Sequence, residues 1–106
     1  MTDSFTDILD EWADLIDAFA QKGEQLAQEE AALKAQEAAQ KKAHMSAGCS
    51  ATKADTLVRA GEDWAQQYRN VQSASVGLEV VKRRIRLCEA RLDVERSRNA
   101  TARKIY

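Results

Sequence analysis

Large apolar residues recur every seven positions in the second half of the chain, and this repeat constrains the fold more than any other feature. Its members are Leu57, Trp64, Val71, Leu78, Ile85 and Leu92. A sustained seven-residue repeat is typical of helices that pack along one another as a coiled coil. A helix carrying this run is roughly 52 Å long at about 1.5 Å per residue, too long for the interior of a small globular domain. The spacing therefore predicts a helical rod.

A second seven-residue repeat runs through the first half of the chain. Its members are Phe5, Trp12, Phe19, Leu26 and Leu33. Ser4 is suited to cap the start of this helix, and Asp7 suits the positive first turn. Gly23 costs such a helix roughly 1 kcal/mol relative to alanine, so the continuity of the helix through this residue is left open.

Helix propensity falls in the middle of the chain, which predicts a tight turn. Gly48 suits a left-handed residue after the first helix, and Ser50 or Thr52 suits the cap of the second. Because short connections join antiparallel helices, the predicted fold is all-α, a long two-helix coiled-coil hairpin. The expected elements are a helix over residues 4–43, a turn over residues 44–53 and a helix over residues 54–104, in a single domain over residues 1–106.

Two helices alone would bury little apolar surface, because the second helix lines its secondary core positions with small or moderate residues. These are Ala60, Ala74, Val81 and Cys88, with Gln67 as a polar exception. A second hairpin would supply the missing surface, so we expect a homodimer that forms a four-helix bundle. The residues expected in the core and at the oligomer contact are Phe5, Trp12, Phe19, Leu57, Trp64, Val71, Leu78, Ile85 and Leu92.

The formal net charge of −1 conceals a polarised chain. Residues 1–37 contain ten acids and two bases, residues 38–81 four acids and five bases, and residues 82–106 three acids and nine bases. An antiparallel register that places residue i beside roughly residue 99 − i brings the acidic face of the first helix to Arg84, Arg91 and Arg98. The chain from Glu95 onward extends past the first helix in this register and remains basic.

This basic end is the predicted binding surface. The residues expected to contact nucleic acid or an acidic partner are Arg96, Arg98, Arg103, Lys104 and Tyr106. Arginine and lysine neutralise phosphates, and a tyrosine ring can stack on a base. The alternative interpretation is a solvated, frayed helix end whose bases complement the negative end of the helix dipole.

The stretch from Lys82 to Ala100 resembles the endings of small helical-hairpin proteins encoded in the early recombination and replication regions of bacteriophages. The resemblance covers about half of the chain. It implies a non-enzymatic, oligomeric accessory protein that acts beside a recombinase, a single-strand-binding protein or DNA. It implies no role for a specific residue.

Two further functions remain open. The acidic face of the first helix would let a phage inhibitor, such as an anti-CRISPR protein, imitate nucleic-acid phosphates and occlude a host protein. Its residues are Asp10, Asp14, Asp17 and Glu24. The other alternative is a purely structural coiled-coil spacer.

Catalytic and cofactor chemistry is not expected. His44 and Cys49 flank the turn, but a zinc site needs two more ligands and Cys88 lies far along the rod. No glycine-rich phosphate loop is present, and paired acids on a helix face imply no concave site. We therefore expect no enzyme activity, metal, cofactor or small-molecule substrate. Without a signal peptide or a membrane-spanning apolar run, we expect a cytoplasmic protein with free thiols and no membrane contact, in the bacterial host cell if phage-encoded.

Overall fold

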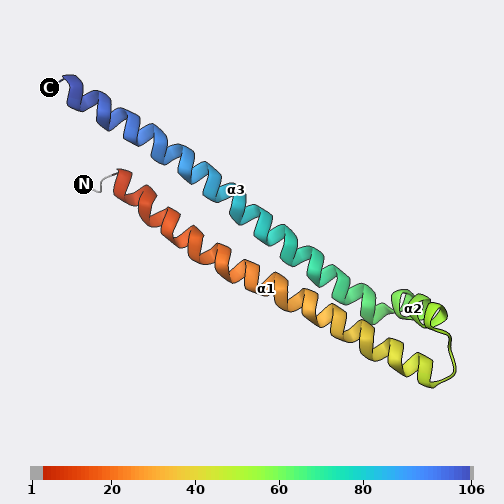
Figure 1. Cartoon of the computed structure of the whole chain (residues 1–106). Coiled ribbons are helices and arrows are strands. Elements are labelled where there is room, and N and C mark those ends of the chain that lie inside the picture. The colour runs from red at the N-terminus through yellow and green to blue at the C-terminus, as the bar shows by residue number, and fades with distance from the viewer. Residues whose placement is uncertain (1–3, 106) are drawn as a thin grey trace. The chain divides into compact units, whose positions relative to one another are not determined.

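The computed structural model describes the backbone of residues 4–105 and the side chains of residues 4–102. Its helices are α1 (Ser4–Ser46), α2 (Ala51–Ala60) and α3 (Glu62–Ile105), and the described residues contain no strand (Figure 1). The predicted all-α class is thus confirmed. The chain divides into two compact units: unit 1 comprises the chain up to Lys22 and from Leu78 onward, and unit 2 comprises Gly23–Gly77. The single domain over residues 1–106 stays a prediction.

Helix α1 ends at Ser46, beyond the predicted end at residue 43, and the predicted left-handed glycine follows it. Gly48 has a φ of 101°, which favours glycine because other residues meet a steric penalty there. Its N–H donates to the carbonyl of Met45 across 3.0 Å, and the N–H of Cys49 donates to the carbonyl of His44 across 3.1 Å. This pair of bonds is the Schellman motif, which satisfies carbonyls at the end of a helix. Helix α1 continues through Gly23 without a break.

The prediction of one continuous helix over residues 54–104 is wrong, because the chain forms two helices, α2 and α3, on either side of Gly61. Ser50 caps α2, since its Oγ accepts a hydrogen bond from the N–H of Lys53 across 3.2 Å. Gly61 then adopts an extended conformation with ψ of 150° and ends α2. The carbonyl of Gly61 accepts from the N–H of Ala65 across 3.2 Å, which opens α3. Glu62 and Asp63 occupy the positive first turn of α3, which favours a new helix start there.

Unit 1 is an antiparallel pair formed by the start of α1 and the end of α3 (Figure 1). Its core is a cluster of Ile8, Cys88 and Leu92, which are 4%, 1% and 6% exposed. Three partly buried side chains of α1, those of Phe5, Trp12 and Leu15, pack against it. The thiol of Cys88 donates to the carbonyl of Ile8 across 3.4 Å, so this cysteine lies at the centre of the seam.

Unit 2 joins α1 to α2 and α3 by polar contacts. The indole Nε1 of Trp64 donates to the Glu37 carboxylate across 2.7 Å, and Trp64 stacks on Tyr68 with ring centres 5.0 Å apart. Gln67 donates from Nε2 to the Oε2 of Glu29 across 2.7 Å and to its backbone carbonyl across 3.0 Å. The polar exception in the predicted core is therefore satisfied by hydrogen bonds, as a buried amide requires.

The most buried positions of α3 are those of the secondary repeat. Ala74, Val81 and Cys88 are at most 6% exposed, and Leu92 is the member of the leading repeat that is equally buried. Two predicted core residues lie at the surface: Leu57 is 40% exposed and Phe19 is 39% exposed. Six others, Phe5, Trp12, Trp64, Val71, Leu78 and Ile85, are half-buried. The seam is therefore centred on small side chains, which lets the helices approach closely but buries little apolar area.

Candidate interaction surface

A cluster of positive charge lies on α3 in unit 1, upstream of the predicted basic end. Lys82, Arg83, Arg84 and Arg86 fall within five residues. Lys82 is paired with Glu79 across 3.2 Å. The three arginines are exposed, and no described carboxylate lies within ion-pair distance of any of them. Their charge is therefore available to an acidic partner.

The arginines of the predicted binding end have partners on their own helix. Arg98 lies 3.3 Å from the carboxylate of Glu95, and Arg96 lies 4.0 Å from that of Asp93. All four residues belong to α3, so these contacts lower the local charge without joining α3 to α1. The helix continues through Arg103 and Lys104, whose side chains lie outside the described residues, as does all of Tyr106. Their proposed roles stay predictions.

An apolar row runs along the same exposed side of α3. Val80, Leu87 and Val94 recur at intervals of seven and are 41%, 63% and 51% exposed. We call these three residues the α3 row. Neighbours three and four positions apart share a helix surface, so Arg84, Arg91 and Arg98 border the row along one side. Arg83 lies on its other side, between Val80 and Leu87 in the sequence.

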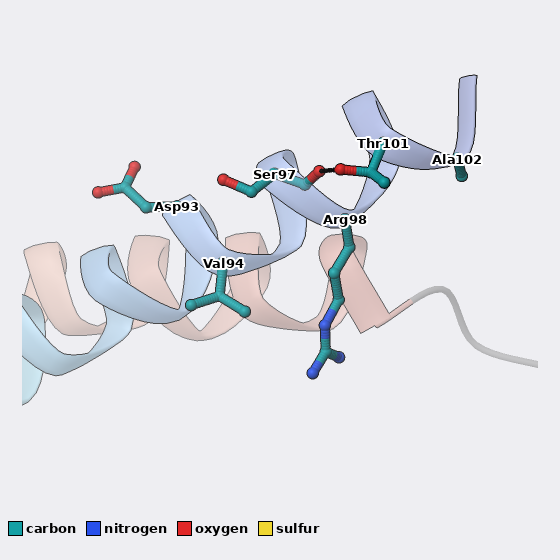
Figure 2. A pocket seen from close by; sticks show the side chains of 6 residues that line it. All are labelled: Asp93, Val94, Ser97, Arg98, Thr101 and Ala102. Atoms are coloured by element: carbon teal, nitrogen blue, oxygen red, sulfur yellow. Dashed lines mark hydrogen bonds between the residues drawn. The ribbon is translucent and has the colours of Figure 1, made fainter. Parts of the chain in front are cut away.

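The end of the α3 row forms part of a hollow of about 610 Å³ in unit 1. Its lining residues are Asp93, Val94, Ser97, Arg98, Thr101 and Ala102. In Figure 2, the side chains of Val94 and Arg98 extend to the same side of α3, whereas Asp93 points elsewhere. The Thr101 hydroxyl donates to the carbonyl of Ser97 across 2.9 Å, so it is occupied by its own helix. Val94 makes one side of this hollow apolar.

The acidic face of α1 remains largely unpaired. Glu11 forms the one ion pair between α1 and α3 among the described residues of unit 1, with Arg91 across 2.8 Å. Asp10, Asp14 and Asp17 are exposed and form no ion pair with a described residue. The expectation that the two charged faces neutralise each other holds for the Glu11 pair and not for these aspartates.

The fourth predicted acidic residue belongs to unit 2. Glu24 accepts a hydrogen bond from the side chain of Gln28, four residues along α1, across 3.4 Å. Because Glu24 is assigned to unit 2 and Asp10, Asp14 and Asp17 to unit 1, we treat the three aspartates alone as the acidic face of unit 1.

The described residues show how the metal-ligating side chains and the Cys88 thiol are placed. No group of three or more His, Cys, Asp or Glu side chains among them is placed to hold a metal ion. Burial raises the pKa of the Cys88 thiol, and the nearby carboxylate of Glu11 adds to this effect. A nucleophilic cysteine needs the opposite shift, toward the thiolate. Cys88 therefore acts as a core residue.

Comparisons with known proteins assign no family to the chain. No protein-family model matches it, and neither the curated proteins nor the solved structures contain a match. In the part of the chain that the structure describes, no helix combines the length and the apolarity needed to cross a membrane.

The sequence contained the signal for the two surfaces that the predictions did not include. The Lys82–Arg86 run is visible as a block of charge, and Val80, Leu87 and Val94 form a third seven-residue repeat. The antiparallel register places Arg84 beside the acidic face of the first helix and the third repeat near Phe5, Trp12 and Phe19, so neither is predicted to be free. It assigns no partner to Arg83 or Arg86.

Proposed function

We propose that this chain is a non-catalytic helical interaction protein that binds nucleic acid through the exposed arginines of α3. The observation that carries the proposal is the absence of an ion pair at Arg83, Arg84 and Arg86 among the described residues. Guanidinium groups bind phosphates in a forked geometry, and the release of counterions then favours association. The cluster adds to the predicted sites at the end of α3.

The resemblance to phage accessory proteins agrees with this function. An oligomeric accessory factor in the cytoplasm of a bacterial host would act on DNA, or beside a protein that processes it. The proposed architecture is a coiled-coil hairpin, supported in unit 1 by the antiparallel contact of α1 with α3 (Figure 1). The assembly expected from the sequence is a homodimeric four-helix bundle, which would cover apolar side chains on one face of unit 1 and leave those on the opposite face exposed.

The test compares two double variants of equal charge change. Arg83→Gln with Arg86→Gln removes unpaired arginines, and Arg96→Gln with Arg98→Gln removes arginines that have partners on α3. Binding of labelled single-stranded and duplex DNA is measured by fluorescence anisotropy between about 50 and 200 mM salt. We expect the first variant to reduce the salt dependence for duplex DNA by about 1.8 log units per log unit of salt. The second variant should change it less, because Asp93 and Glu95 already offset part of the charge of Arg96 and Arg98.

Two results would overturn this proposal. One is the absence of DNA binding by the whole chain at low salt. The other is unchanged binding by the first double variant together with complete loss when residues 96–106 are removed, since that result places the site at the end of α3 alone.

A second candidate function is supported by the unpaired aspartates of α1. Asp10, Asp14 and Asp17 follow one exposed side of the helix and could imitate phosphates toward a basic host protein that binds nucleic acid. Asp10→Asn, Asp14→Asn and Asp17→Asn combined should then abolish inhibition of that protein. If the triple variant still inhibits, or if the whole chain leaves nucleic-acid defence enzymes unaffected, this candidate fails.

A further inference from the structure

We infer that unit 1 carries a self-association contact in which the α3 row of one copy packs on an apolar band of α1 in a second copy. The α1 band consists of Leu9 and Ile16 with the adjacent Ala13 and Ala20. The inference goes beyond nucleic-acid binding and does not depend on it. It identifies the partner of two exposed apolar surfaces that the fold of unit 1 leaves uncovered.

The α3 row places three exposed apolar side chains along one side of the helix. Leu87 is the most exposed of its members at 63%, and Val80 and Val94 lie one heptad to either side. Positive charge borders the row at Arg83 and Arg84, neither of which forms an ion pair with a described residue. An apolar centre with a charged border is the composition of an interface between proteins rather than of a surface that binds nucleic acid alone.

The α1 band has the complementary composition. Leu9 is 36% exposed and Ile16 is 40% exposed, and Ala13 lies between them on the helix surface. Asp10 and Asp17 border the band on its outer side, each within three or four residues of Ala13. Neither aspartate forms an ion pair with a described residue.

The two surfaces match in both spacing and charge. Leu9 and Ile16 are seven residues apart, as are the members of the α3 row, so both repeat at about 10.5 Å along a helix. Asp10 and Asp17 share that spacing, and so do Arg84 and Arg91. Packing of one α3 row on another would instead bring arginines together, and like charges across an interface are unfavourable. Charge therefore selects α1 of the second copy as the occupant.

The Glu11–Arg91 bridge shows that the two surfaces lie on opposite edges of the seam. On α1, Glu11 and the α1 band flank the core residues Ile8 and Trp12 from opposite sides. On α3, Arg91 lies between the core residues and the α3 row, so the row lies on the edge of the seam where the Glu11–Arg91 ion pair forms. One copy therefore cannot turn both surfaces toward the same neighbour. The contact is head-to-tail, and such contacts build rings or open chains rather than closed twofold dimers.

Substitutions at two exposed residues test the contact in the 106-residue chain. Leu87→Gln disables the α3 row and Ile16→Gln disables the α1 band, while the core of unit 1 is untouched in both. Met45→Gln is the matched control, because Met45 is 46% exposed and belongs to unit 2. Sedimentation velocity over a range of concentrations gives the mass, and circular dichroism confirms that each variant is helical.

We expect the wild-type mass to rise past that of a dimer with concentration, and the control to behave in the same way. Each disabling variant should associate at least about tenfold more weakly. An equimolar mixture of the two should give a heterodimer that grows no further, because one copy retains the row and the other retains the band. Leu87→Gln should still bind DNA, so failure of this contact is distinguishable from failure of the proposed function. The inference is overturned by a monomeric wild type, by a mass that saturates at the dimer, or by an Ile16→Gln variant that associates normally.

Discussion

The Nη1 of Arg91 donates to the Oε2 of Glu11 across 2.8 Å, and this contact joins α3 to α1 within unit 1. Both side chains are about half exposed, so water screens their attraction. We expect a double-mutant cycle with Glu11→Gln and Arg91→Gln to give a coupling free energy of about 0.5 kcal/mol. The cycle is measured by urea unfolding at low salt, and the coupling should shrink as salt is added. A coupling that persists at high salt would contradict this assignment.

The two cysteines should differ in reactivity. Cys88 is 1% exposed and burial raises the pKa of its thiol, whereas Cys49 is partly exposed beside the turn after α1. A thiol reagent at mildly alkaline pH should therefore modify Cys49 rapidly and Cys88 only after unfolding. Rapid modification of both thiols in the folded protein would contradict the burial of Cys88. The Cys49→Ser variant isolates the slow reaction.

The raised pKa of Cys88 also predicts a pH dependence of stability. The unfolded chain loses this proton at a lower pH than the folded protein does, because the folded pKa is the higher one. The stabilisation is thus complete below the ordinary thiol pKa and is lost as the pH rises through the folded value. Thermal unfolding between neutral and alkaline pH should show a decline that Cys88→Ala reduces. An identical pH profile in that variant would show that other groups cause the decline.

Substitution by alanine should have opposite effects on stability at Gly23, which lies inside α1, and at Gly48, which follows its end. Gly48 has a φ of 101°, which an alanine adopts only with strain, so Gly48→Ala should lower the free energy of unfolding by about 1 kcal/mol or more. Gly23 lies inside α1 with nothing within 4 Å of an added Cβ. Gly23→Ala should therefore stabilise by about 0.5–1 kcal/mol. Urea unfolding followed by circular dichroism measures both, and a stabilising Gly48→Ala would be inconsistent with the left-handed turn.

Substitution by phenylalanine should lower the free energy of unfolding by different amounts at Trp12 and at Trp64. The Nε1 of Trp64 donates to Glu37, whereas the buried Nε1 of Trp12 has no hydrogen-bond partner among the described residues. Trp12→Phe removes an unsatisfied donor, and this offsets part of the lost packing. Trp64→Phe removes a bond to a charged group, which contributes about 1.5–3 kcal/mol. Trp64→Phe should therefore be the more destabilising, and the reverse order in urea unfolding would contradict these contacts.

Local chemistry made the turn predictable, and a long-range pattern concealed the break in the second helix. Gly48 takes its left-handed role because it lacks a Cβ, and this role is predicted from the sequence. For the cap of the second helix the sequence offers Ser50 or Thr52, and the structure uses Ser50. The sequence repeat does not predict a break at Gly61, because Leu57 and Trp64 preserve the seven-residue spacing across it. The sequence does carry the signal, since Gly61 is followed by two acids that suit a helix start.

The candidate surface was harder to predict, for a physical reason. Heptad spacing places acidic and basic residues on facing sides, but an ion pair also needs long side chains that meet within about 4 Å. Glu11 and Arg91 meet this condition, whereas Asp14 and Arg84 do not. Small rotations of each helix decide such contacts, and a repeat in the sequence does not determine them. The charges left over are those on which both proposals rest.

The extended backbone at Gly61 also limits the local stability of α2. It leaves α2 with ten residues, fewer than the roughly 12–15 that a helix needs to be stable in water on its own. Its attachment rests on Ala54 and Val58, which are buried, and on the Lys41–Asp55 ion pair across 3.2 Å. Local opening of α2 therefore breaks few contacts, so its amides should exchange with solvent hydrogen sooner than those in the middle of α1.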